Sequence, residues 1–162
     1  MIRITFKNVG QGDTILLEWE KSGLKKIGVI DCNKTPNTPS VLDYIISKNY
    51  KRIEFLLLTH LHTDHFSGFY SLIHYCLENN IQVGYFLHTS NFSKEFWKMA
   101  VNNAEAINES MRLFQIVREA RQKMAMKVHS IQGDSPFPPM GIGDYFLKIL
   151  APTSNELDKF VN

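Results

Sequence analysis

Apolar and polar residues alternate at the start of the chain in the pattern of half-buried strands. Ile2, Ile4 and Phe6 are each separated by one polar residue, so one face of an extended segment would be apolar. Glycines at positions 10, 12 and 23 mark tight connections to two further apolar segments. The pattern predicts an antiparallel meander with strands at residues 2–6, 14–19 and 25–31, the last of which ends in Asp31.

The next part of the chain alternates between helical and strand patterns. Ser40 can cap a helix over residues 41–49, in which Leu42, Ile45 and Ile46 would form an apolar face. A short apolar run then predicts a buried strand over residues 51–59. A second helix is expected from residue 67 or 68 to about residue 80, followed by a strand at residues 82–87. This alternation of elements predicts an α/β fold.

Residues 91–127 depart from this pattern because their apolar residues recur at helical spacings. We expect one long helix or a helical pair that buries Phe96, Ile107, Phe114 and Val117 together or against the sheet. We interpret the apolar stripe as packing on its own domain, and the alternative is a lid or a surface for a protein partner or for self-association. The later half is basic, which a solvated face explains as well as nucleic acid does.

The remaining residues predict a strand at 127–131, a Pro/Gly loop at 133–143 and a closing strand at 144–150. With 162 residues, 44% hydrophobic and 21% charged, the composition is that of a single globular domain over residues 1–162. No apolar run approaches the roughly 20 residues of a membrane span, and no secretory signal begins the chain, so we expect a cytoplasmic protein without a membrane partner. Cys32 and Cys76 are too few for a disulfide framework, and the net charge of +2 excludes neither nucleic acid nor a small anion.

The segment from Thr59 to Gly68 carries the densest chemistry in the chain. Its sequence, Thr-His-Leu-His-Thr-Asp-His-Phe-Ser-Gly, holds three of the six histidines and one aspartate after the predicted buried strand. In extended chain His60 and His62 would point to the same side, and a following turn would let Asp64 and His65 reach the same pocket. Imidazoles and a carboxylate are ligands that zinc prefers, so the segment predicts a metal site.

This segment resembles the signature of the metallo-β-lactamase fold. Two other segments agree with the resemblance: residues 8–17, Asn-Val-Gly-Gln-Gly-Asp-Thr-Ile-Leu-Leu, are similar to the N-terminal hairpin of the ComEC-like, competence-type branch, and residues 29–31, Val-Ile-Asp, match a strand that ends in aspartate ahead of the histidine motif. The resemblance covers about residues 1–90 and resumes at residues 147–152. It implies a four-layer αββα sandwich, with residues 91–127 as an insertion.

The resemblance also implies a set of roles for individual residues. His60 and His62 would bind one metal ion, and Asp64 and His65 would bind a second, with Asp64 and Asp31 as the catalytic pair. The ions would be Zn²⁺, two in a complete site, or Mn²⁺, and about 3.5–4 Å apart they would share a hydroxide for hydrolysis. Asp31 would orient a ligand or its loop by hydrogen bonding. Asp13 is expected to stabilise its glycine-rich turn rather than the metals.

The family pattern needs a bridging aspartate after a later strand and a further histidine, and neither is evident here. Asp134 precedes the last predicted strand, and His88 and His129 are weaker candidates for ligands. We therefore expect the chain to be the N-terminal part of a longer protein, truncated on the C-terminal side of the fold and inactive by itself.

The predicted function is metal-dependent hydrolysis of phosphodiester bonds in nucleic acid or a nucleotide, a substrate class implied by the branch resemblance alone. Two alternatives remain open. One is a thioester or lactone hydrolase of the glyoxalase II type, against which the Gly-Gln-Gly-Asp stretch argues. The other is a binding or regulatory module that retains the fold without a complete site.

Overall fold

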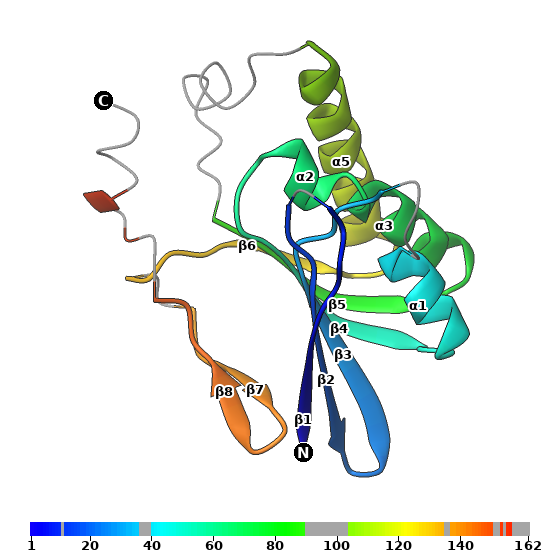
Figure 1. Ribbon diagram of the computed structural model, residues 1–162, viewed down its shortest axis with the longest axis vertical. Helices are drawn as coiled ribbons and strands as arrows, with labels where there is room; N and C mark the ends of the chain where they lie inside the picture. The colour runs from blue at the N-terminus through cyan, green and yellow to red at the C-terminus, as the bar shows by residue number, and fades with distance from the viewer. Residues whose placement is uncertain are drawn as a thin grey trace.

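The computed structural model describes residues 1–10, 12–35, 40–89, 104–134, 137–150, 153 and 155–156. It is an α/β protein whose main sheet has six strands in the order β1-β2-β3-β4-β5-β6, with a separate two-stranded sheet beside it (Figure 1). The strands are β1 (Ile2–Phe6), β2 (Ile15–Lys21), β3 (Leu24–Ile30), β4 (Arg52–Leu58), β5 (Gln82–His88), β6 (Lys127–Ser130), β7 (Met140–Ile142) and β8 (Tyr145–Leu147). The helices are α1 (Val41–Ser47), α2 (Thr63–Phe66), α3 (Phe69–Glu78) and α5 (Ala104–Lys123).

The first three strands form the predicted antiparallel meander. Strands β1 and β2 pair with Ile4 opposite Leu17, and β2 and β3 are joined by a two-residue turn. Both turn residues, Ser22 and Gly23, have positive φ angles, of 53° and 74°. Two positive φ angles match the right-handed twist of the flanking strands, and glycine adopts such an angle without a steric penalty.

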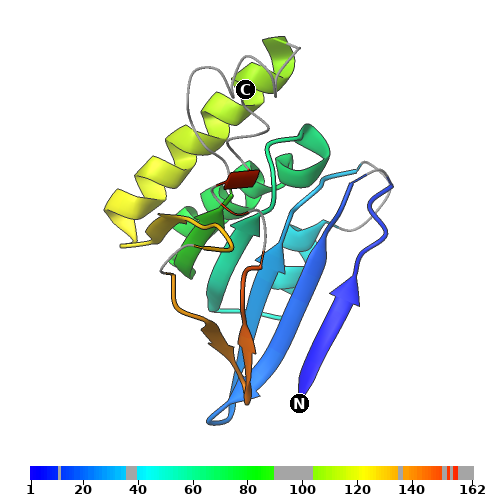
Figure 2. The same cartoon turned by 90° about the vertical axis from the view of Figure 1, so that its left-hand side faces the viewer.

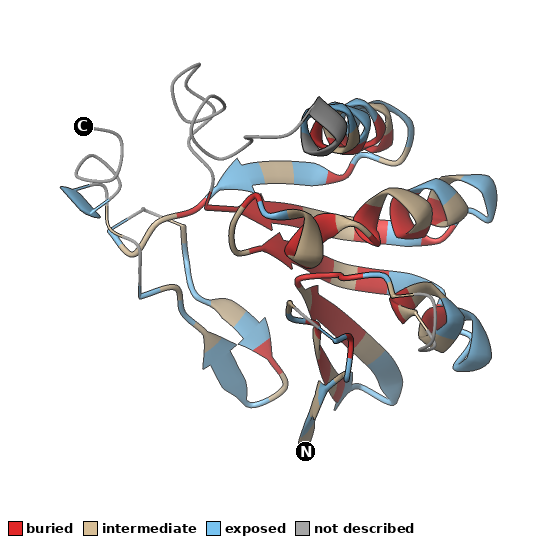
Figure 3. Ribbon diagram, turned by 45° about the horizontal axis from the view of Figure 1, so that its top comes forward, coloured by how far each residue is buried: buried red, intermediate tan, exposed pale blue. Residues whose placement is uncertain are grey.

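From β3 onward the strands are parallel, and a helix lies in each connection. The pairs β3–β4, β4–β5 and β5–β6 are all parallel, with α1, α3 and α5 in the three connections. Helix α1 begins at a capping box in which Ser40 and Asp43 satisfy each other's backbone N–H groups. All three helices cover the same face of the sheet, which we call the helix-side face (Figures 1 and 3).

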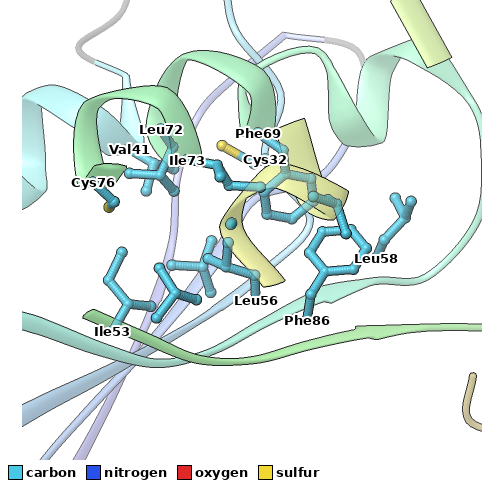
Figure 4. Close-up of a cluster of buried hydrophobic side chains, with 14 of the residues drawn as sticks. Cys32, Val41, Ile53, Leu56, Leu58, Phe69, Leu72, Ile73, Cys76 and Phe86 are labelled. Atoms are coloured by element: carbon cyan, nitrogen blue, oxygen red, sulfur yellow. The ribbon is translucent and has the colours of Figure 1, made fainter. Parts of the chain in front are cut away.

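The main core fills the space between the helices and the helix-side face. Figure 4 shows Phe69 and Leu72 of α3 lying over Leu56 of β4 and Phe86 of β5. The rings of Phe69 and Phe86 meet edge to face, with centroids 5.7 Å apart. Leu42 is half-buried and Ile45 is buried as the helical pattern predicts, whereas Ile46 is exposed and does not belong to the apolar face of α1.

The opposite face of the sheet is covered by the β7–β8 hairpin, and we call it the hairpin-side face (Figure 2). Here Trp19, Phe55, Leu57 and Leu87 pack with Ile142 of the hairpin. The sequence prediction was wrong on two counts: residues 133–143 contain β7 and are not all loop, and residues 145–147 pair with β7 and do not close the main sheet. Gly143, at φ 65°, makes the tight turn that joins the two short strands.

The predicted helical segment at residues 91–127 is described only in part. Helix α5 covers Ala104–Lys123 and buries Val117, with Phe114 half-buried against the main core, as expected. Ile107 is 39% exposed, so its predicted burial was wrong: it lies outside the strip of α5 that faces the sheet. Phe96 lies outside the described residues. In the described part of the chain, no helix combines the length and apolar character needed to cross a membrane.

Candidate metal centre

The candidate site lies where the parallel strands end. Strands β3, β4 and β5 finish at Ile30, Leu58 and His88, and their parallel register brings these carboxyl ends to one edge of the sheet. The segment after β4 is anchored to its neighbours, because the Thr89 hydroxyl after β5 donates to the carbonyl oxygen of Thr59. Ligand sites of open α/β sheets form at this edge, so the fold places the histidine motif where a site is expected.

The histidine motif turns sharply after β4. His62 is still extended, at φ −109° and ψ 142°, and serves as the N-cap of the one-turn helix α2. Asp64 and His65 therefore lie on α2, a helical turn where the sequence predicted only a change of direction. The backbone N–H of His65 donates to the carbonyl of His62 at 2.9 Å, which folds the later ligand candidates back toward the earlier ones.

The three histidine rings of the motif lie together, as predicted. The ring centroids of His60 and His62 are 4.7 Å apart, and those of His60 and His65 are 3.9 Å apart. The Asp64 carboxylate approaches the same group, with Oδ2 3.8 Å from Nε2 of His65. One surface of the loop therefore gathers three imidazoles and a carboxylate.

Asp31 anchors this group from the end of β3. Its backbone adopts the left-handed region, with φ 51°, which aspartate tolerates better than most residues. Its buried carboxylate accepts three hydrogen bonds: from the Thr59 backbone N–H at 2.8 Å, from the Thr59 hydroxyl at 2.6 Å and from Nδ1 of His65 at 2.8 Å. The prediction that Asp31 lies beside the motif and accepts hydrogen bonds from it is confirmed.

These hydrogen bonds fix which nitrogen of two histidines carries the proton. His65 must donate from Nδ1, because an ionised carboxylate only accepts. The Thr59 hydroxyl gives its single proton to Asp31, the shorter and charge-assisted contact, so it accepts from Nδ1 of His60 at 3.0 Å. In both rings Nδ1 therefore carries the proton and Nε2 keeps its lone pair. A neutral imidazole with a free lone pair can bind a metal ion.

The electrostatics of the loop also favour neutral imidazole. Partial burial lowers the pKa of His60, and the adjacent His65 and His62 lower it further. Cys32, next to Asp31, is fully buried, and burial together with the Asp31 charge raises the pKa of its thiol well above the usual range. Cys32 is therefore held as a thiol, and Cys76 is likewise buried, with the pKa of its thiol raised to about 12 by burial. Neither is an activated nucleophile.

The glycine-rich hairpin loop packs directly against the motif. Gly12 has φ 90°, and a Cβ there would overlap the backbone carbonyl of Asp64. Thr14 is buried, and its hydroxyl accepts from the backbone N–H of Asn33 at 2.9 Å and donates to the carbonyl of Asp13. The side chain of Asp13 is exposed, and its expected role in the turn stays a prediction.

The remaining ligand candidates have different surroundings, although His88 ends β5 beside Leu58, at the same edge of the sheet as the motif. His88 is buried with its ring beside Phe86, a core residue of the helix-side face. His129 is exposed on β6 and lies near Tyr85 and Phe137 toward the hairpin. Asp134 is exposed in the loop that leads to the hairpin. The structure therefore groups four of the predicted site residues, His60, His62, Asp64 and His65, around the fifth, Asp31.

The types of donor in this group suit a zinc ion, but the side chains as placed do not form an ion-binding group. Three imidazoles, two of them with Nε2 left as acceptor, and one carboxylate match the preferences of zinc. However, no three His, Cys, Asp or Glu side chains among the described residues converge closely enough to hold a metal ion. His62 is exposed and the Asp64 side chain is 43% exposed, so both can change rotamer without disturbing the core.

Sequence reasoning missed two residues that shape this centre. Thr59 bridges Asp31 and His60 through one hydroxyl, and its position next to the first histidine was the available signal. Gly12 was identified as a turn residue, but its contact with Asp64 joins positions 52 apart in the chain and has no local signature. Comparison of the chain with protein-family models and with curated proteins finds no match, so the resemblance of its motifs stays a prediction.

Proposed function

We propose that this chain binds a divalent metal ion through His60, His62, Asp64 and His65 and acts in metal-dependent hydrolysis of phosphodiester bonds. The observation that supports the proposal is the gathering of three histidine rings, at centroid distances of 3.9 and 4.7 Å, at the carboxyl end of the parallel strands. The ion proposed is Zn²⁺ or Mn²⁺. When bound, such an ion supplies Lewis acidity and makes water a nucleophile near neutral pH.

The chain's own residues prepare the ligands. Asp31 holds His65 directly and His60 through the Thr59 hydroxyl, so both rings keep one orientation and one tautomer. A ligand that is oriented in advance loses less conformational entropy when it binds. Asp64, at the partly exposed side of the group, is placed to accept a proton from water or to bind the ion. The phosphodiester class rests on the resemblance to the competence-type branch.

Metal binding is tested with Co²⁺ or Zn²⁺, independently of activity. Isothermal titration and the visible absorption of the Co²⁺ form should report one bound equivalent, held more weakly in the His62→Ala and Asp64→Ala variants. The His74→Ala variant is the matched control, because His74 is an exposed histidine of α3 whose contacts are with Glu78, at 3.3 Å, and with the Tyr70 ring. Equal affinity in all four proteins, or no binding by the unmodified chain, would overturn the assignment.

Hydrolysis is then measured on the full-length protein with bis(p-nitrophenyl) phosphate and added Zn²⁺ or Mn²⁺. We expect turnover that the His62→Ala variant loses and the His74→Ala variant retains, with unchanged thermal unfolding in both. Metal binding without turnover of this substrate, but with turnover of a thioester, would replace the phosphodiester class by a thioester class.

A further inference from the structure

A cavity of about 380 Å³ adjoins the histidine motif on the helix side. It is bounded by the loop after β3, the start of α3 and the face of α5, and Phe66 and Ser67 in its wall directly follow His65. Its volume is within the range of pockets that bind small ligands. The polar residues that line it are Lys34, Ser67, Tyr70, Ser71, Glu109 and Arg112.

Two exposed cations line this cavity, and neither forms an ion pair within the described residues. In the described part of the chain, neither Lys34 nor Arg112 has a carboxylate oxygen within the 4.0 Å of an ion pair. Lys34 comes from the loop that follows Asp31, and Arg112 comes from α5, so the charges enter from different elements. Two cations against the single carboxylate of Glu109 give the lining a net positive charge, which favours an anionic ligand.

The exposed guanidinium of Arg112 makes a cation–π contact. It lies over the ring of Tyr70, 4.6 Å from the centroid, and the other neighbour of that ring is His74, stacked at 5.9 Å. Stacking occupies the flat face of a guanidinium and leaves the N–H groups at its edge available to a ligand. These donors match the oxygens of a phosphate.

The other polar groups restrict the ligand further. The Ser67 hydroxyl donates to Oδ1 of Asn33 and accepts from the backbone N–H of Lys34, so it shapes the loop. Ser71 offers a hydroxyl beside the cations, and Glu109 adds one carboxylate to the wall. A carboxylate next to a phosphate site opposes a bare anion and accepts a hydrogen bond from a hydroxyl or amino group attached to the phosphate-bearing ligand.

We propose that this cavity binds a nucleotide phosphate, with Arg112 and Lys34 on the phosphate and Glu109 accepting from the sugar or base. The inference rests on the proposed function, because it places a phosphate of the substrate next to the histidine motif. The same chemistry would take one unit of a nucleic acid strand or a free mononucleotide. The length dependence of binding distinguishes these two sources.

The test uses binding in EDTA, so that neither metal nor turnover is needed. Fluorescence anisotropy of a 5′-fluorescein-labelled ten-nucleotide oligothymidylate is measured with the full-length protein, and thymidine monophosphate and inorganic phosphate are added as competitors. We expect the Arg112→Gln and Lys34→Gln variants each to weaken binding about tenfold or more, the usual scale for a hydrogen bond between two charged groups. Arg112→Lys should bind more tightly than Arg112→Gln because it keeps the positive charge. It should not reach the original affinity, because lysine lacks the paired N–H donors of the guanidinium.

The matched control is Arg118→Gln, on the same helix. Arg118 is exposed and six residues from Arg112, about 240° around the helix, and its replacement changes the net charge equally. We expect less than a twofold effect. Thermal unfolding of each variant shows whether the protein remains folded. Because Lys34 does not lie on α5, Lys34→Gln tests the cavity without changing that helix.

Each result decides between the two proposals. If thymidine monophosphate competes as strongly as the oligonucleotide, the ligand is a mononucleotide. If the affinity increases with oligonucleotide length, the ligand is a nucleic acid strand. Equal losses in Arg112→Gln and Arg118→Gln, or no binding of either probe, overturn the cavity assignment. Zn²⁺ affinity, measured by isothermal titration, should be the same in Arg112→Gln as in the unmodified protein, so a failure of the cavity assignment leaves the metal assignment standing. If the unmodified protein binds no metal but Arg112→Gln selectively loses oligonucleotide binding, the cavity assignment stands and the metal assignment fails.

Discussion

The two faces of the six-stranded sheet are covered to different extents. The helix-side face packs against α1, α3 and α5 from β2 onward, and its core runs from Leu16 of β2 to Val117 of α5. Among the described residues, the hairpin-side face is covered near its middle, and at its edge Ile4 and Phe6 of β1 are 54% and 75% exposed. Three crossover helices cover more of a sheet than one short hairpin can, so stability should depend mainly on the helix-side face.

The largest effect is expected from Phe69→Ala, in the centre of the helix-side core. Phe69 is fully buried against Phe86, so its truncation removes apolar contact and leaves a cavity between α3 and the sheet. The expected loss is about 3–5 kcal/mol of unfolding free energy, measured by urea denaturation. Phe146→Ala is the control, because Phe146 is 74% exposed on the hairpin. A loss below 1 kcal/mol for Phe69→Ala would contradict the dominance of this face.

Ile142→Ala tests how firmly the hairpin is attached. Ile142 is the buried residue of β7 in the hairpin-side core, so the expected loss is about 2 kcal/mol, the lower end of the range for such a truncation. Hydrogen exchange should show faster exchange in β7 and β8 than in β4. Tyr145→Ala, at an exposed position of the same hairpin, should change neither measurement. Equal acceleration in β4 would mean that both faces unfold as one unit.

Gly28→Ala addresses the sheet beneath the hairpin. Gly28 lies in β3 opposite Phe55 of β4, and a Cβ at Gly28 would overlap the Phe55 ring. The ring would have to move toward Trp19, whose centroid is 6.4 Å away, at an expected cost of about 1–3 kcal/mol. Gly141→Ala is the control, because a Cβ there meets nothing within 4 Å. Equal unfolding temperatures of the two variants would show that the hairpin-side core is loosely packed.

Most of the helix-side face could be predicted from local sequence. Alternating residues gave the meander, and Ser40 with the apolar positions after it gave α1. The strand before His60 placed the histidine motif at the carboxyl edge of the sheet. Each of these signals lies within about ten residues, the range over which periodicity and capping act.

The rest depended on contacts between distant residues. The positive φ of Asp31 is set by its three hydrogen bonds to Thr59 and His65, about 30 residues away, and no pattern around Asp31 indicates it. The hairpin was missed because β7 has three residues in a Pro/Gly-rich stretch, too few for alternation to be recognised. Steps of three and four residues connect Ile107 to Val117, but their sum of ten residues places Ile107 about 80° around the helix from Val117, off the buried strip.

Ser40→Ala should have a moderate effect, at the edge of the helix-side face. The Ser40 hydroxyl accepts from the backbone N–H of Asp43, and Asp43 Oδ2 accepts from the Ser40 hydroxyl and backbone N–H. Loss of this cap should cost about 1 kcal/mol in thermal unfolding. The hydrogen bonds from Ser40 lower the pKa of Asp43, so their stabilisation is present above the unfolded pKa of about 3.9 and is lost as the pH falls through the folded value. The difference between variant and unmodified protein should therefore shrink in acid, and Ser47→Ala, at the far end of α1, should show no such pH dependence.

Phe6→Ser should have the smallest effect, and it tests the uncovered edge of the hairpin-side face. Phe6 pairs with Ile15 on that face, and among the described residues β1 is the outermost strand of the sheet. A side chain that is 75% exposed contributes little to folding, so the unfolding free energy should change by less than about 0.5 kcal/mol. Leu16→Ser, the fully buried neighbour of Ile15 on the helix-side face, should unfold the protein at much lower urea. A loss above 1 kcal/mol in Phe6→Ser that depends on protein concentration would mean that a second copy covers this edge in solution. Only a ring that is buried by another copy could contribute so much to the unfolding free energy.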